Sequence, residues 1–151
     1  MSGSNAVGVL LVNLGTPAAP RTTEVRRFLR EFLSDPRVMD MNPISRFLVL
    51  NCLILPFRSS KSAAAYRKIW LPEGSPLLYH SQRLRDALAT ELGPRFRVAL
   101  AMRYGQPSLG DALDALHAQN VQELVVVPLF PQDAAASHTS VGVEPQSAVS
   151  G

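Results

Sequence analysis

Apolar residues along the chain form three short runs that have the length of β-strands. The first run covers residues 7–13 and is followed by the turn-forming tripeptide Gly-Thr-Pro. Similar runs occupy residues 98–102 and 124–129. Strands that are apolar on both faces are typical of a parallel sheet with helices on each side. The pattern therefore predicts three buried, parallel strands.

Helical periodicity predicts a helix soon after the first strand. Its apolar residues recur at the i, i+3, i+4, i+7 and i+8 spacing of one helix face: Val25, Phe28, Leu29, Phe32 and Leu33. Thr22 or Thr23 is predicted to cap its first turn, in which Glu24 is favourably placed. Asp35 and Pro36 are predicted to end the helix.

The next predicted helix covers residues 44–55 and is apolar on almost every side. Asn42 and Pro43 have the pattern of an N-cap followed by proline in the first turn. A helix without a polar face is either buried or contacts something apolar outside the protein. Further helices are predicted over residues 59–69, after Ser75 and Pro76, and after a capping box formed by Ser108 and Asp111.

The resulting order, β-α-α-α-α-β-α-β, predicts an α/β fold with a doubly wound parallel sheet. We expect one domain over residues 1–132 and an irregular or disordered tail over residues 133–151, which are rich in Ala, Ser, Val and Gly. Ligands of such sheets bind beyond the carboxyl ends of the strands. Of these ends, the one at Arg103 and Tyr104 carries the polar groups best suited to recognition.

Charge and composition narrow the classes of ligand and the location. The net charge is +3, and all basic residues except Lys61 and Lys68 are arginines, scattered along the chain without a basic block. This distribution argues against nucleic-acid binding and suits a carboxylate-bearing small molecule or an anionic lipid. The single cysteine, Cys52, excludes an internal disulfide. The longest apolar run, residues 47–57, reaches about half of the ~20 residues of a spanning helix, and the start lacks a leader pattern, so we expect a cytoplasmic protein, soluble or peripheral to the inner membrane.

Several groups of polar residues are candidates for chemistry, and each has a structural alternative. Arg103 and Tyr104 offer a carboxylate-binding fork and a stacking hydroxyl; alternatively, Arg103 pairs with a helix carboxylate while Tyr104 packs. The turn after the first strand lacks a phosphate-binding glycine motif, which favours a plain connection. Arg58, Tyr66 and Ser75 can form hydrogen bonds, but their spacing does not show that they converge. The three histidines are too far apart in sequence to suggest a metal site.

Six segments, in their order along the chain, resemble the ferrochelatase family. They are LVNLGTP (residues 11–17), FLREFLSDPRV (28–38), SAAAYRKIW (62–70), GSPL (74–77), MRYGQPS (102–108) and PLFPQ (128–132). The resemblance implies a two-lobed, flavodoxin-like fold that inserts ferrous iron into a porphyrin to make haem, with no cofactor for the chemistry. It covers the amino-terminal lobe only. A chelatase that loads another metal in a related tetrapyrrole pathway is an alternative of the same kind.

The resemblance also implies roles for individual residues. Leu14 matches the loop that faces the porphyrin. Arg58, Tyr66 and Ser75 match positions that contact the macrocycle or its propionates, and Arg103 and Tyr104 match pocket residues. The apolar stretch of residues 39–55, which begins with Met39 and ends with Leu55, resembles the lip of the porphyrin mouth, which also lets the enzyme rest on a membrane. A flat apolar ring with anionic edges requires apolar walls and a few arginines.

The residues after Gln132 depart from the family pattern. Asp133 stands where the family has an aromatic residue, and the family's metal-handling histidine and its acidic partner belong to a second lobe. We therefore expect no catalytic and no metal-binding residue here, and an inactive, truncated form of the enzyme. A non-catalytic porphyrin- or haem-binding module is the alternative. A sheet without its second lobe is also expected to self-associate through an unpaired edge.

Overall fold

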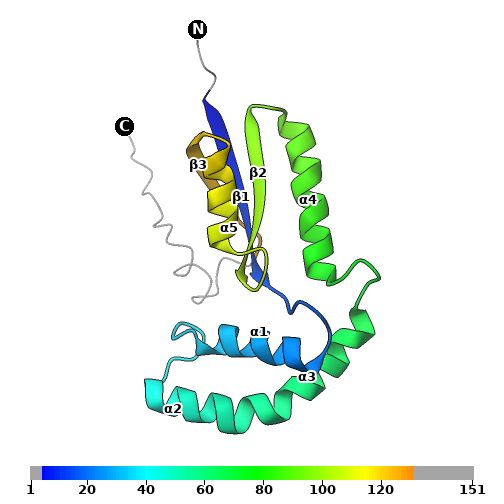
Figure 1. Cartoon of the computed structure of the whole chain (residues 1–151), viewed down its shortest axis with the longest axis vertical. Coiled ribbons are helices and arrows are strands. Elements are labelled where there is room, and N and C mark those ends of the chain that lie inside the picture. The colour runs from blue at the N-terminus through cyan, green and yellow to red at the C-terminus, as the bar shows by residue number, and fades with distance from the viewer. Residues whose placement is uncertain (1–4, 131–151) are drawn as a thin grey trace.

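Three parallel strands form the central sheet, in the order β2-β1-β3 (Figure 1). In the computed structural model, which describes residues 5–130, they are β1 (Ala6–Gly15), β2 (Phe96–Tyr104) and β3 (Val121–Pro128). Leu11 of β1 pairs with Leu100 on one side and with Val127 on the other. All three predicted strands are confirmed. β2 and β3 begin before their apolar runs because backbone pairing extends through polar residues such as Arg97 and Glu123. The predicted tail, residues 133–151, lies outside the described residues.

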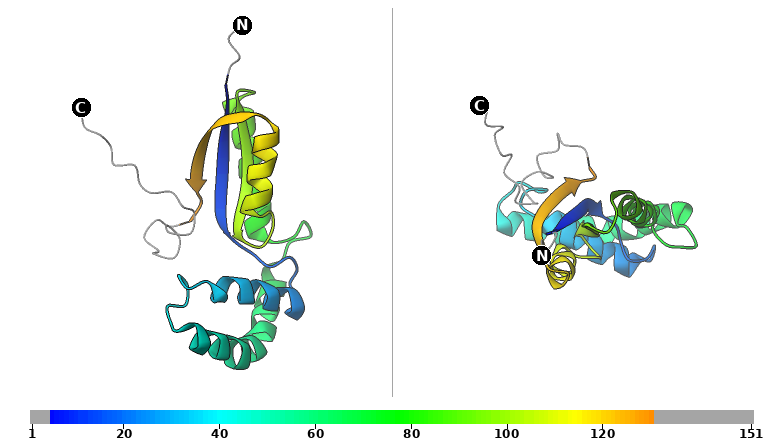
Figure 2. Two further views of the ribbon diagram at one scale, coloured as in Figure 1. Left: turned by 60° about the vertical axis from the view of Figure 1, so that its left-hand side comes forward. Right: turned by 90° about the horizontal axis from the view of Figure 1, so that it is seen from above.

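Helices cover both faces of the sheet, as the doubly wound order predicts (Figure 2). On one face α4 (Pro76–Leu92) packs against Val9 and Leu11 of β1. On the other face α5 (Leu109–Ala118) packs against Leu10 and Val12. Alternate residues of β1 therefore enter opposite cores, which is why this strand is apolar at every position from 7 to 12 that carries a side chain.

A separate group of helices lies beyond the carboxyl ends of the strands (Figure 1). It consists of α1 (Thr22–Ser34), α2 (Pro43–Leu48), the π-helix η1 (Val49–Ile54) and α3 (Leu55–Ile69). Val25 and Leu29 of α1 pack against Leu50, Leu55 and Ala63 in a core of their own. We call residues 21–69 the helical layer. It stands at the sheet edge where open α/β folds bind their ligands.

The helices predicted separately over residues 44–55 and 59–69 are one continuous helical run, so the break predicted between them is wrong. Pro56 has no N–H group and cannot continue a regular α-helix. The π-helix η1 precedes it, and at its end the N–H of Leu55 donates to the carbonyl of Leu50, five residues earlier. The wider turn lets the chain pass the proline without ending the helix.

Two of the three predicted caps are confirmed. The Asn42 side chain accepts a hydrogen bond from the N–H of Ile44 at 2.9 Å, and the Ser108 side chain accepts one from the N–H of Asp111 at 3.1 Å. The cap predicted at Thr22 or Thr23 is wrong, because α1 begins one residue early and both threonines lie inside its first turn. Thr23 donates to the carboxylate of its neighbour Glu24 instead.

The apolar stretch of residues 39–55 is buried on one side only. Leu50 is 2% exposed, whereas Ile44, Phe47 and Leu48 are 72%, 65% and 53% exposed. These three exposed residues have the i, i+3, i+4 spacing of one helix face, and we call them the apolar patch. Across residues 5–130, every helix is too short or too polar to cross a membrane.

Candidate functional site

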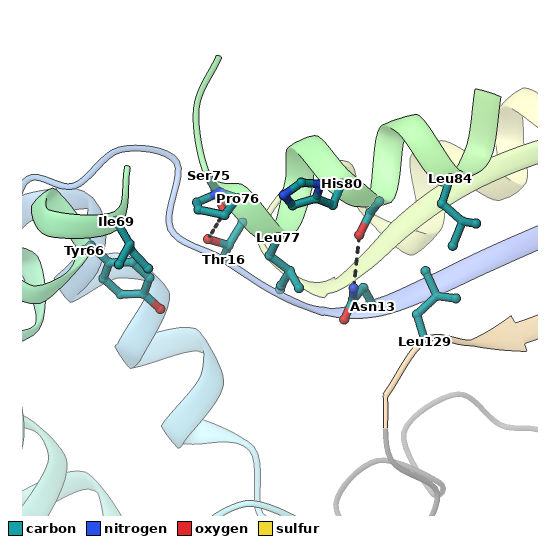
Figure 3. A pocket seen from close by; sticks show the side chains of 12 residues that line it. Asn13, Thr16, Tyr66, Ile69, Ser75, Pro76, Leu77, His80, Leu84 and Leu129 are labelled. Atoms are coloured by element: carbon teal, nitrogen blue, oxygen red, sulfur yellow. Dashed lines mark hydrogen bonds between the residues drawn. The ribbon is translucent and has the colours of Figure 1, made fainter. Parts of the chain in front are cut away.

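A cavity of about 620 Å³ opens at the carboxyl end of β1, between the end of α3 and the first turns of α4 (Figure 3). Its volume lies within the range of small-molecule sites. Its walls are mostly apolar, with a few hydroxyl, amide and imidazole groups. The lining residues are Asn13, Gly15, Thr16, Tyr66, Ile69, Ser75, Pro76, Leu77, His80, Ser81, Leu84 and Leu129.

Two buried hydrogen bonds fix the floor of the cavity to α4. The side-chain amide of Asn13, at the end of β1, donates to the hydroxyl of Ser81 at 3.1 Å. In the loop that follows β1, the hydroxyl of Thr16 lies 2.7 Å from that of Ser75. All four side chains are buried, and each of these polar groups has a partner, so the loop after β1 is held in one position. The cavity is therefore preformed.

Helix α4 supplies one wall of the cavity through a single stripe of side chains. Leu77, His80, Ser81 and Leu84 follow the i, i+3, i+4, i+7 spacing of one helix face. Ser75 occupies the N-cap position, but its hydroxyl bonds to Thr16 and not to a helix N–H. The start of α4 is thus tied to the loop that forms the floor.

The structure places the six predicted porphyrin-binding residues in different surroundings. Tyr66 and Ser75 line the cavity together. Leu14 is half-buried and lies between two lining residues without lining the cavity itself. Arg58 is exposed on α3 and is not part of the cavity wall, and neither is Arg103 or Tyr104.

Arg103 and Tyr104 contact a carboxylate at the end of α1. The same oxygen of Asp35 accepts hydrogen bonds from Nη2 of Arg103 at 3.2 Å and from the Tyr104 hydroxyl at 2.8 Å. The Tyr104 ring packs edge-on against Phe32, with centroids 5.1 Å apart. The geometry agrees with the structural alternative for this pair, in which the arginine pairs with a helix carboxylate and the tyrosine packs.

The Asp35 cluster shifts two pKa values in opposite directions. Burial opposes ionisation of Asp35, but hydrogen bonds from the Arg37 backbone and Tyr104, with the charge of Arg103, hold its pKa below the ordinary value. Burial and the adjacent Asp35 raise the pKa of Tyr104 to about 12. The Nε atom of Arg103 is buried and has no hydrogen-bond partner among residues 5–130.

Few groups in the cavity carry charge. Tyr66 and His80 are its ionisable side chains, and burial raises the pKa of Tyr66, which keeps the phenol neutral. Within residues 5–130, no three histidine, cysteine or carboxylate side chains gather as a metal site. The cavity is therefore built to hold an apolar molecule with a small number of polar contacts.

Comparison with known proteins decides which family has this arrangement. The sequence model of the family described as ferrochelatase matches residues 6–150. The chain belongs to the ferrochelatase family. The match extends beyond Gln132, into residues that we predict to be an irregular tail, and that prediction stays untested.

Named relatives support the same family. A ferrochelatase of Coxiella burnetii (strain Dugway 5J108-111) is 51% identical over 132 residues, which cover 87% of this chain and 37% of the relative. One of Hamiltonella defensa is 52% identical, with 89% and 42% covered, and one of Xylella fastidiosa (strain M12) is 48% identical, with 93% and 44% covered. The chain thus spans about two fifths of the length of these ferrochelatases.

Sequence reasoning missed several lining residues of this ferrochelatase-family cavity. Asn13, the last fully buried residue of β1, and Ser81 were not singled out, although a polar residue at the carboxyl end of an apolar strand is a usable signal. The sequence predicts a plain turn around Thr16, and the distance of His80 from the other histidines gives no sign of a site. Helical spacing from Leu77 could have placed His80 on the cavity side of α4.

Proposed function

We propose that this chain forms the porphyrin-binding part of a ferrochelatase, the enzyme that inserts ferrous iron into a porphyrin in haem biosynthesis. The observation that carries the proposal is the cavity at the end of β1, which contains Tyr66 and Ser75, two of the predicted contacts. Family membership supports the same ligand class. The position agrees with the general rule for ligands of open α/β sheets.

The cavity walls suit the faces of a porphyrin, and its anionic edges need cations nearby. The apolar side chains Ile69, Leu77 and Leu84 provide contact area for the ring. Arg58 is exposed and forms none of the ion pairs found among residues 5–130, so its guanidinium is available to a propionate. Arg103 is already paired with Asp35, so a porphyrin carboxylate would have to compete for it.

We infer that these residues bind porphyrin without inserting iron. Metal insertion requires two pyrrole protons to be removed and the ring to be distorted. In the cavity, Tyr66 remains a neutral phenol. His80 is the neighbouring base, and it takes part in none of the ion pairs found within residues 5–130. The named ferrochelatases are more than twice as long as the matched segment, which leaves room for a second wall that carries the base. A non-catalytic porphyrin-binding module is the alternative that the same cavity supports.

Titration with protoporphyrin tests the binding proposal. Leu77→Glu places a carboxylate in the cavity wall, and Leu113→Glu is its matched control, because Leu113 on α5 is similarly exposed (41% against 38%) and lies outside the cavity. We expect a Soret shift with the unchanged chain and with Leu113→Glu, and at least a tenfold weaker affinity with Leu77→Glu. Equal affinities for the two variants would contradict the cavity as the binding site. Iron insertion by the purified chain at a rate comparable to a full-length ferrochelatase would contradict the inferred inactivity.

We also propose that the helical layer rests on the surface of the inner membrane, on its cytoplasmic side. Residues 21–69 carry ten basic and four acidic side chains, a net charge of +6, whereas the remaining residues carry a net charge of −3. The apolar patch, Ile44, Phe47 and Leu48, belongs to this basic layer. Apolar side chains next to basic ones are the combination that binds anionic bilayers.

Self-association through β3 is a further proposal. In the sheet formed by residues 5–130, β3 is an edge strand, and its residues Leu124 and Val125 are 44% and 49% exposed. Unpaired apolar edges favour pairing between chains. Val125→Lys is expected to shift a concentration-dependent oligomer to monomer in sedimentation, and a monomer at all concentrations for the unchanged chain would contradict the proposal.

A further inference from the structure

His80 occupies the middle of the cavity wall formed by α4. Leu77 and Leu84 are about 10 Å apart along the helix axis, and His80 lies between them on the same face. In Figure 3 its ring lies on α4 between Pro76 and Leu84. An imidazole thus lies beside the Ser81 hydroxyl in the centre of a wall whose two ends are leucines.

The neighbouring polar groups of this wall are engaged, and the His80 ring is not. Asn13 is bonded to Ser81, and Thr16 to Ser75. No side-chain hydrogen bond among residues 5–130 involves the His80 ring, which is exposed and meets Tyr79 edge-on at 5.2 Å between centroids. Its nitrogen lone pair is therefore free to bind a group that enters the cavity.

An imidazole at this position distinguishes a tetrapyrrole that contains iron from one that does not. A metal-free porphyrin offers an imidazole no electrophilic centre, whereas the iron of haem accepts the lone pair of a neutral histidine as an axial ligand. Leucines at the two ends of the wall can contact the ring while the imidazole between them approaches its centre. The other ionisable side chain of the cavity, Tyr66, stays protonated because burial raises its pKa.

We propose that His80 binds the iron of haem held in this cavity, so that the chain retains the iron-containing product more tightly than the metal-free porphyrin. The inference rests on the proposed function, because it needs the cavity to accept a tetrapyrrole. The step forms one coordinate bond from the imidazole nitrogen to iron, displaces a water ligand where one is bound, and changes no oxidation state.

Ferric haem and metal-free protoporphyrin, titrated separately into the purified chain, test the proposal. We expect haem to give the absorption and electron paramagnetic resonance spectra of an imidazole-ligated iron. His80→Ala should abolish this signature and weaken haem binding about tenfold or more, a clearly larger loss than the same variant shows for protoporphyrin. Added imidazole should restore the ligated spectrum in His80→Ala. His117→Ala is the matched control, since His117 is exposed on α5 and outside the cavity.

Each outcome distinguishes this inference from the proposed function. An unchanged haem spectrum in His80→Ala, or the same loss in His117→Ala, overturns the role of His80 and leaves porphyrin binding intact. Haem binding through His80 without any protoporphyrin binding supports the ligand and overturns the cavity as a porphyrin site. The absence of binding by both compounds overturns both proposals.

Discussion

The hydroxyl of Tyr104 donates a 2.8 Å hydrogen bond to the carboxylate of Asp35 and thereby joins the end of β2 to the end of α1. Arg103 donates to the same carboxylate oxygen at 3.2 Å. The side chain of Asp35 is only 9% exposed, so this contact is largely shielded from water. It is one of the few polar contacts that attach the helical layer to the sheet, and it makes the relative position of the two layers sensitive to a single charge.

Removing this carboxylate is expected to destabilise the chain. Asp35→Ala leaves the Arg103 and Tyr104 donors without a partner, and we expect the free energy of unfolding to fall by about 2–3 kcal/mol. Asp40→Ala, a change at an exposed residue, is the control and should cost less than about 0.5 kcal/mol. Urea denaturation of both variants measures the difference, and equal midpoints would contradict the role of Asp35.

The cost of Asp35→Ala should depend on pH in a defined direction. The folded chain holds the pKa of Asp35 below its ordinary value of 3.8, so the carboxylate stabilises the fold when it is charged in both states. As the pH falls through 3.8 and toward the lower folded-state pKa, that contribution is lost. The difference between the unchanged chain and Asp35→Ala should therefore be largest near neutral pH and shrink below about pH 4.

Tyr104 should make the fold sensitive to alkali. Its pKa is raised from the ordinary 10.0 to about 12, so the unfolded chain loses this proton first and stability falls as the pH rises from 10 to 12. In an absorbance titration of the three tyrosines, Tyr104 should give a late phase near pH 12, and Tyr66, whose pKa burial also raises, should ionise above the ordinary value of a phenol. Tyr104→Phe should remove the late phase and lower stability at neutral pH by about 1.5–3 kcal/mol. A late phase that persists in Tyr104→Phe would show that another tyrosine carries the shift.

Gly15 is expected to tolerate no side chain. Its φ is +133°, and a Cβ atom would lie 2.0 Å from the carbonyl oxygen of Tyr104 on the neighbouring strand. Gly15→Ala should therefore lower the free energy of unfolding by more than about 3 kcal/mol. Gly74→Ala is the matched control, because Gly74 has φ +122° but nothing within 4 Å of the added atom; we expect about 1–2 kcal/mol. Equal losses in thermal unfolding would show that the steric contact with Tyr104 is relieved.

The apolar patch should determine binding to anionic vesicles. Replacing Ile44 and Phe47 together by serine is expected to reduce sedimentation with phosphatidylglycerol vesicles about tenfold or more, since two largely exposed apolar side chains no longer enter the bilayer. The melting temperature should be unchanged because neither residue is buried. Leu113→Ser, on the opposite layer, is the control and should bind as the unchanged chain does. Undiminished binding of the double variant would contradict this surface as the contact.

Local patterns predicted the elements well, and tertiary contacts explain what they missed. The strands and most helix starts follow from features carried by a few adjacent residues, such as the apolar runs and the Asn42 and Ser108 caps. The π-helix before Pro56 could not be predicted, because it depends on Leu50 and Leu55 both entering the core with α1. Similarly, no local signal shows that Arg103 turns toward Asp35, which is 68 residues away.

In the candidate site too, some residues were predictable from the sequence and others depend on tertiary contacts. Tyr66 and Ser75 were predicted from a family resemblance and share the cavity, whereas Arg58 and Arg103 lie outside its wall. The residues that fix the floor, Asn13 and Thr16, pair with partners on α4 that sequence reasoning did not associate with them. Sequence therefore identified which segments meet at the sheet edge, and coordinates were needed to say which side chains face one another.

The π-helix η1 (Val49–Ile54) also sets the rotational phase of a long helix. Each residue of an α-helix turns the chain by about 100°, so the extra residue held in a π turn rotates everything before it relative to everything after it by that angle. The segment before η1 can thus point Ile44 and Phe47 to solvent, while the segment after it buries Ser59 and packs Ala63 against α1. Deleting one residue of η1 would change the rotation between the two segments. The apolar side chains of α2 would then point in another direction, although none of them had been substituted.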